Sequence, residues 1–111
     1  MERDKRTHPM VRVSWPVTML TTQGPIEGEV TNISLGGAFV YCQEQPNANE
    51  TFRMVIRTPH AHEFIIVNAR IARSTIYKPE DANTLHGVGV RFTSLSEEDR
   101  EFISALVQDQ F

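Results

Sequence analysis

The stretch VRVSWPVTM, residues 11–19, has apolar side chains at every odd position and mostly polar ones between them. A period of two is typical of a β-strand with one buried and one exposed face. Pro16 falls on the exposed side, where its missing N–H marks an edge of a sheet or a bulge. The stretch therefore predicts a half-buried strand over residues 11–19.

Further strands are predicted from apolar or β-branched runs between turn signals. Gln23-Gly24-Pro25 is a turn signal, and Gly36-Gly37 interrupts the chain before another apolar run. The polar segments are expected to be loops, and they cover residues 43–50, 58–63 and 74–85. The six predicted strands cover residues 11–19, 28–33, 38–42, 52–57, 64–73 and 87–92.

The end of the chain changes to helical spacing. Ser96 stands three residues before Asp99, which is the arrangement of a helix N-terminal cap, and acidic residues follow it in the first turn. The apolar residues then recur four apart in two rows: Phe102, Ile103, Leu106 and Val107. We expect a helix over about residues 96–109 that packs on the strands. The pattern predicts an all-β fold, a six-stranded antiparallel barrel with a C-terminal α-helix.

Length and composition limit the class of protein. The chain has 111 residues, of which 40% are hydrophobic, so it fits one domain with a real core. No apolar run is long enough to cross a bilayer, and no signal-peptide pattern opens the chain. The lone Cys42 forms no internal disulfide and suits a reducing compartment. We expect a cytoplasmic protein with no membrane insertion.

Charge is unevenly distributed along the chain. Residues 1–12 hold four basic and two acidic side chains, a net charge of +2, whereas the whole chain carries −3. The acidic remainder makes a nucleic acid polymer a poor partner. We expect residues 1–10 to be a flexible basic arm that precedes a single domain over residues 11–111. A basic end on an acidic body indicates an anion-binding site near the N-terminus.

Candidate catalytic and metal-binding residues find little support. His60 and His62 have the spacing of a metal pair, but no third ligand is evident nearby. Ser34 lies in a Gly-rich turn without the glycine two positions before it that a nucleophile elbow requires. Cys42 alternates with Val40 and is interpreted as a small core residue. Core packing is also expected for the aromatic side chains Trp15, Phe39, Phe52, Phe64 and Phe92.

Two elements remain, the basic segment before the first strand and the sequence NISLGG at residues 32–37. Asn32 and Ser34 stand two apart, so an extended chain presents an amide and a hydroxyl to one side, and the glycines permit close approach of a ligand. An arginine on a flexible arm could close over this surface and bind a phosphate. The alternative is an ordinary Asx or Ser turn that closes a hairpin.

These residues resemble the PilZ domain family. Asn32-x-Ser34-x-x-Gly37 matches its Asp/Asn-x-Ser-x-x-Gly motif, and the basic segment stands where the family has its Arg-x-x-x-Arg motif. The closing sequences GVGVRF (87–92) and LSEEDR (95–100) also look like those of the family. The resemblance covers roughly residues 4–110. It implies a PilZ-type barrel that acts as a bacterial receptor for cyclic di-GMP, with arginines on the phosphates and guanine, and the Asn and Ser contacting a guanine.

One position departs from the family pattern. Arg6 takes the first arginine position and the second falls on Met10, so one cation is lost. A charge-assisted phosphate contact contributes on the order of 1.5–3 kcal/mol, which predicts roughly 10- to 150-fold weaker binding. Arg12 lies on the same strand face, about 6.6 Å further along, and offers partial compensation. The expected ligand site comprises Arg6, Met10, Arg12, Asn32, Ser34 and Gly37.

Three hypotheses follow. The first is a non-enzymatic cyclic di-GMP receptor of reduced affinity that signals through ordering of its arm and a partner protein, for example in motility. The second, which Met10 favours, is a degenerate PilZ adapter that binds no nucleotide and acts by protein–protein interaction. The third is an enzyme or metal protein that uses His60, His62 or Ser34. We expect no metal, no cofactor besides cyclic di-GMP as ligand, and a monomer or weak homodimer.

Overall fold

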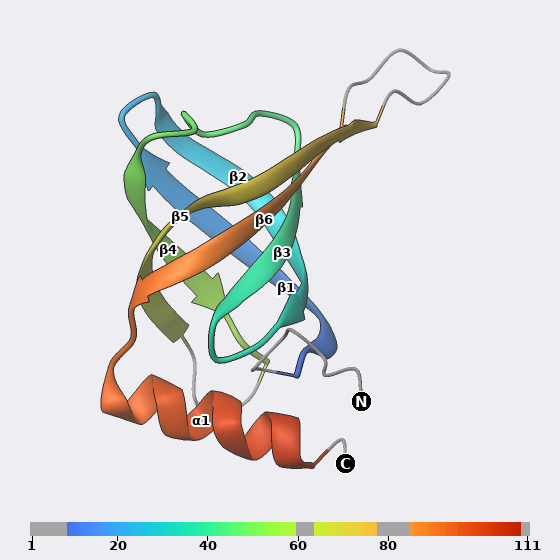
Figure 1. Ribbon diagram of the computed structural model, residues 1–111, viewed down its shortest axis with the longest axis vertical. Coiled ribbons are helices and arrows are strands. Elements are labelled where there is room, and N and C mark those ends of the chain that lie inside the picture. Colours follow the sequence, from blue (N-terminus) through green and yellow to red (C-terminus); the bar gives the residue numbers. More distant parts are fainter. Residues whose placement is uncertain (1–8, 60–63, 78–84, 110–111) are drawn as a thin grey trace, which may run out of the picture.

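The computed structural model describes residues 9–59, 64–77 and 85–109. Within these ranges, six strands form a closed antiparallel barrel that is followed by one helix (Figure 1). The strand order around the barrel is β1-β2-β3-β6-β5-β4, so that β1 pairs with both β2 and β4. The elements are β1 (Val11–Thr21), β2 (Gly24–Ile33), β3 (Gly37–Cys42), β4 (Thr51–Arg57), β5 (Phe64–Tyr77), β6 (Leu85–Ser94) and α1 (Glu97–Gln108). The predicted fold class is confirmed.

The inward faces of the strands fill the barrel. On β1 the alternation predicted from the sequence is observed, with Trp15, Val17 and Met19 buried and Pro16 exposed. The register between β1 and β2 shifts between Arg12 and Trp15, so Pro16 follows a bulge in a barrel that has no open edge. Fully buried side chains from the other strands complete this core: Val30, Ile33, Val40, Met54, Ile56, Ile65 and Val88.

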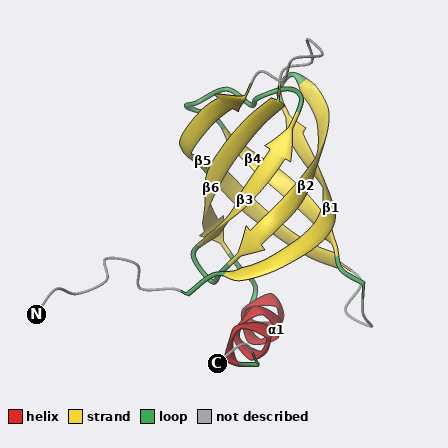
Figure 2. Cartoon of the chain, turned by 90° about the vertical axis from the view of Figure 1, so that its right-hand side faces the viewer, coloured by secondary structure: helices red, strands yellow, loops and turns green. Residues whose placement is uncertain are grey.

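Helix α1 lies across one end of the barrel (Figures 1 and 2). The Ser96 hydroxyl accepts a hydrogen bond of 3.1 Å from the Asp99 N–H, which is the predicted N-terminal cap. Ile103 is fully buried, and the Phe102 ring lies 6.3 Å from the ring of Trp15 on β1. The apolar face of the helix therefore packs against the open end of the barrel core.

The predicted start of β2, end of β5 and start of β6 are wrong. β2 begins at Gly24 rather than at residue 28, because residues 24–27 already pair with β1 directly after the turn. Gly24 has a φ of 103°, which favours glycine at the point where the chain reverses. The polar segment 74–85 was expected to be a loop, but β5 continues to Tyr77 and β6 begins at Leu85. β5 and β6 form a hairpin whose pairing continues past the barrel (Figure 1). Hydrogen bonds between main chains do not require an alternation of apolar side chains.

The expectation of core packing is wrong for two of the five aromatic side chains. Trp15 and Phe52 are buried, and Phe92 is partly buried against the core. Phe64, in contrast, is 46% exposed, and Phe39 is partly exposed on the outer face of β3. The physical reason for Phe39 is register, because its neighbours Ala38 and Val40 take the inward positions on β3.

The predicted core position of Cys42 is confirmed. The side chain is 3% exposed, opposite His86 in the pairing of β3 with β6. Burial, reinforced by the negative charge of Glu44, raises the pKa of the Cys42 thiol to about 11. The raised pKa favours the protonated thiol near neutral pH, whereas the thiolate is the reactive form.

Candidate functional site

The turn between β2 and β3 is built by Ser34. Its hydroxyl accepts hydrogen bonds from the N–H of Gly36 (3.1 Å) and of Gly37 (3.3 Å), and its own N–H donates to the Gly37 carbonyl (2.8 Å). β2 ends at Ile33, so strand alternation does not continue to Ser34, and the side chain is buried in the turn. The hydroxyl therefore does not face outward beside Asn32, and the alternative of a Ser turn closing a hairpin describes this geometry.

The same turn is fixed to β6. The Phe92 N–H donates to the Gly36 carbonyl at 2.9 Å. A Cβ atom at Gly37 would lie 2.1 Å from the Val90 carbonyl oxygen, so only glycine permits this approach of β3 to β6. The turn is consequently a rigid element on the surface of the barrel, anchored before any ligand arrives.

A row of outward positions crosses the barrel at the level of this turn. Arg12 pairs with Asn32, Asn32 with Phe39, Phe39 with Gly89, and Gly89 with Arg73. These residues come from β1, β2, β3, β6 and β5, which are adjacent strands on one side of the barrel (Figure 2). Residues far apart in the sequence thus share one surface.

An open groove of about 790 Å³ lies over the part of this row from Asn32 to Arg73, and Arg12 is not among its lining residues. Its cationic side chains are Arg73 on β5, Arg91 on β6 and Arg100 in the first turn of α1, all three exposed. Among the described residues that line the groove there is no carboxylate. The lining consists of Met10, Asn32, Ser34, Leu35, Gly36, Gly37, Ala38, Phe39, Ala72, Arg73, Gly89, Val90, Arg91, Phe92 and Arg100.

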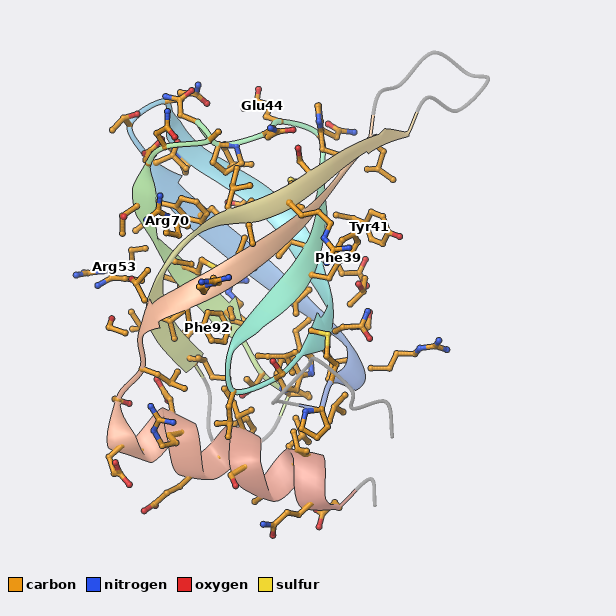
Figure 3. All side chains as sticks on the ribbon, viewed as in Figure 1. Phe39, Tyr41, Glu44, Arg53, Arg70 and Phe92 are labelled. Carbon is orange, nitrogen blue, oxygen red and sulfur yellow. The ribbon has the colours of Figure 1, made fainter. Side chains whose placement is uncertain are left out.

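This composition suits an anion that carries flat rings. Three guanidinium groups supply positive charge and planar hydrogen-bond donors for phosphates. The Phe39 ring is held edge-on to Tyr41, with 5.4 Å between ring centroids and an angle of 85°. Figure 3 shows both rings on the outer side of β3, whereas Phe92 lies on β6 toward the helix end.

The predicted site residues are partly brought together. Met10, Asn32, Ser34 and Gly37 all line the groove, and Met10 is 37% exposed. Arg12 is exposed and neighbours Asn32 across the strands. Arg6 lies outside the described residues, as do His60 and His62.

The predicted ligand site did not include Arg73, Arg91 and Arg100. Arg91 stands at an outward position in an otherwise apolar strand, in Val90-Arg91-Phe92, whereas Arg100 follows the acidic residues at the start of α1. Such a residue reads as ordinary surface charge. The strand order, which sets β6 beside β3 and β5 beside β6, brings Arg91 and Arg73 to the groove at the Asn32–Gly37 turn, and Arg100 reaches it from α1.

The described residues also bear on metal binding and on membrane crossing. In the described ranges, no group of three or more His, Cys, Asp or Glu side chains is arranged to hold a metal ion. No helical segment of the same ranges combines the length and apolarity that crossing a bilayer requires.

Solved structures share this barrel at low sequence identity. The Bacillus subtilis inhibitor of motility, MotI/DgrA, is 17% identical with a TM-score of 0.75, covering 97% of this chain and 51% of that one. The PilZ domain of YcgR from Escherichia coli, solved with c-di-GMP, is 10% identical with a TM-score of 0.71, covering 96% and 91%. PlzA of Borreliella burgdorferi, solved in complex with c-di-GMP, is 12% identical with a TM-score of 0.68, covering 91% and 50%.

These likenesses establish the fold, and the chain spans about half the length of MotI/DgrA and of PlzA. No curated protein sequence matches the chain. A family model described as "PilZ domain" matches residues 3–109, nearly the whole length. The chain therefore belongs to the PilZ domain family.

Proposed function

We propose that this chain is a non-enzymatic receptor that binds cyclic di-GMP in the groove at the Asn32–Gly37 turn. The observation that carries the proposal is the lining of this groove, where three arginines surround the PilZ motif turn and the described lining residues include no carboxylate. The ligand has two phosphates and two flat bases, which match guanidinium groups and a partly exposed aromatic ring. YcgR and PlzA, which share the fold, were solved with the same ligand.

The motif residues have separate roles in this proposal. The Asn32 amide, partly exposed at the groove, hydrogen-bonds a guanine edge. Ser34 acts through the turn that it holds, and Gly37 allows the close approach of β3 to β6. Arg6 closes over the ligand from the arm, and Arg12 assists from beside Asn32.

Met10 reduces the affinity in this proposal. It lines the groove with an apolar side chain at the position where the family motif has its second arginine. The loss of one charge-assisted phosphate contact corresponds to roughly 10- to 150-fold weaker binding.

The signal would pass through the N-terminal arm, residues 1–10, to a partner protein in the cytoplasm. Ordering a chain segment costs roughly 1–2 kcal/mol per residue for the backbone, and this cost opposes an ordered arm in the absence of ligand. Contacts of Arg6 with a phosphate would offset part of the cost and shift the arm toward an ordered state. Amide hydrogen exchange of residues 3–12 tests this step. Protection that appears only with nucleotide supports a sensor, and protection without nucleotide contradicts it.

A degenerate PilZ adapter is the second candidate, and Met10 is the observation that favours it. In this case the chain binds a protein partner without nucleotide, and the groove would be occupied by that partner or stay open. The two candidates differ in one measurable property, which is nucleotide affinity.

Calorimetric titration of the chain with cyclic di-GMP at low and moderate salt separates the two candidates. We expect saturable binding that weakens as salt rises, because cations meet phosphates. GTP serves as the control nucleotide and should bind more weakly. A flat titration at both salt concentrations would reject the receptor and leave the adapter.

Chemical-shift mapping then locates the ligand. Perturbed amides should cluster at residues 5–12, at residues 32–37 and at the groove positions 73, 89 and 91. Perturbations centred instead on the opposite end of the barrel, around Glu27 and Cys42, would contradict the assignment of the groove.

A further inference from the structure

The floor of the groove contains a gap between two walls. Gly89 lies between Phe39 of β3 and Arg73 of β5 in the strand register. A Cβ atom placed on Gly89 would lie 3.8 Å from Phe39 Cδ1 and 3.8 Å from Arg73 Cβ. The aromatic ring and the arginine stem therefore flank an empty position above a bare backbone.

The distances set an upper limit on the separation of Phe39 Cδ1 and Arg73 Cβ, and this limit leaves room for one flat ring. Both walls contact the same Cβ position at ordinary van der Waals distance, so they stand less than about 8 Å apart. A ring stacked between two planes requires a separation of roughly 7 Å, twice the usual contact distance. The edge contact of Phe39 with Tyr41 favours the ring position that forms one wall.

We propose that Phe39, Gly89 and Arg73 form a stacking slot for a purine base. The base lies over Gly89, with the Phe39 ring on one side and the planar Arg73 guanidinium on the other. This inference rests on the proposed function and assigns one guanine of cyclic di-GMP to residues outside the family motif.

The phosphates lie beside the slot in this arrangement. Arg91 is two residues beyond Gly89 on the same outward face of β6, about 6.6 Å along the strand. Arg100 approaches the same groove from α1. These two guanidinium groups supply positive charge in place of the second arginine of the family motif, where this chain has Met10.

The proposed slot requires that residue 89 has no side chain, because the base occupies that space. The strand itself tolerates a methyl group there, since the nearest atoms stand at 3.8 Å. An alanine at position 89 would fill the floor of the slot and leave the barrel intact. Stability and ligand binding should thus separate at this residue.

The test is calorimetric titration of cyclic di-GMP into four variants, with thermal melting of each as a check on folding. Gly89→Ala and Phe39→Leu should each weaken binding at least tenfold, which is the size of one lost base stack. Arg73→Lys keeps the charge but not the plane, and it should weaken binding nearly as much as Arg73→Ala. Pyrophosphate is the base-free probe, and its affinity should be unchanged by Gly89→Ala and Phe39→Leu.

Arg53→Ala is the matched control, because Arg53 extends from the opposite side of the barrel from Phe39 (Figure 3). It should leave affinity unchanged. If the wild-type chain binds cyclic di-GMP and Gly89→Ala binds equally well, the slot is wrong while the receptor stands. Full rescue by Arg73→Lys would also overturn stacking in favour of charge alone. A wild-type chain that binds no cyclic di-GMP rejects the receptor and the slot together.

Discussion

Arg12 on β1 lies directly opposite Asn32 on β2. The adjacent pair, Val11 and Ile33, is buried in the core. Both side chains face away from the core, and Asn32 belongs to the groove lining. This pairing makes Arg12 the cross-strand neighbour of the motif asparagine. We therefore expect Arg12 to compensate in part for the arginine that Met10 replaces in the predicted motif register.

Substitution of Arg12 tests this role by a double-mutant cycle. We expect Arg12→Ala to weaken cyclic di-GMP binding about tenfold in the wild-type background, as one charge-assisted contact is lost. In a Met10→Arg background the same change should have little effect, because the restored arginine takes the contact. Calorimetry of the four proteins gives the coupling. Additive effects would show that the two positions act independently.

Met10→Arg should tighten cyclic di-GMP binding by roughly tenfold or more. The added cation stands at a position that already lines the groove, so it meets a phosphate without a rearrangement of the barrel. The salt dependence of the affinity should steepen as well. Ala48→Arg, in an exposed loop, adds the same charge elsewhere and serves as the control. Equal affinity of Met10→Arg and wild type would refute the register of the arginine motif.

Arg91→Ala and Arg100→Ala should each lower the affinity for cyclic di-GMP about tenfold and flatten its salt dependence. Both residues are exposed, so thermal stability should change little. Titrations at several salt concentrations measure both effects. A normal salt dependence in both variants would mean that the phosphates lie elsewhere.

Gly37→Ala should destabilise the fold strongly, by roughly 3 kcal/mol or more, because a Cβ there collides with the Val90 carbonyl at 2.1 Å. Gly89→Ala is the matched control on the neighbouring strand. Its new methyl meets ordinary contacts at 3.8 Å, and we expect a change within about 1 kcal/mol. Urea unfolding of both variants gives the comparison. Equal stabilities would contradict the close approach of β3 to β6.

Cys42 should resist alkylation in the folded protein. Burial, with the charge of Glu44, raises its thiol pKa from 9.0 to about 11. The thiolate fraction near pH 8 is then roughly two orders of magnitude smaller than in the unfolded chain. Because the folded pKa is raised, the unfolded state loses its proton first, so this group lowers stability as pH rises from 9 toward 11. Maleimide labelling with and without urea measures the contrast, and equal rates would refute the burial.

Local patterns predicted the elements well where one face of each element is buried. The alternation of β1 and the cap and apolar rows of α1 depend on side chains within a few residues, and both were recognisable. The hairpin of β5 and β6 beyond the barrel was missed, because residues 74–85 form a mostly polar segment and pairing between main chains leaves no local signal in the sequence. Phe39 and Phe64 were misplaced because an apolar side chain does not itself say which face of a strand it occupies.

The motif turn was also accessible from sequence, since Asn32, Ser34 and Gly37 lie within one short segment. The structural role of Ser34 could not be predicted from the sequence, because the hydrogen bonds that its hydroxyl accepts depend on how the turn closes. Arg73, Arg91 and Arg100 are separated from the turn by 36 residues or more in the sequence. No local signal connects them to it.

By itself, the sequence determined the strand periodicity, the helix at the end and the family motif, and it predicted that Met10 replaces an arginine. Each of these is a property of neighbouring residues and of the short-range forces between them. Only the tertiary structure decided the groove. Closure of the barrel in the order β1-β2-β3-β6-β5-β4 sets Asn32, Phe39, Gly89 and Arg73 side by side, because hydrogen-bond register between strands is a long-range relationship that no single segment contains.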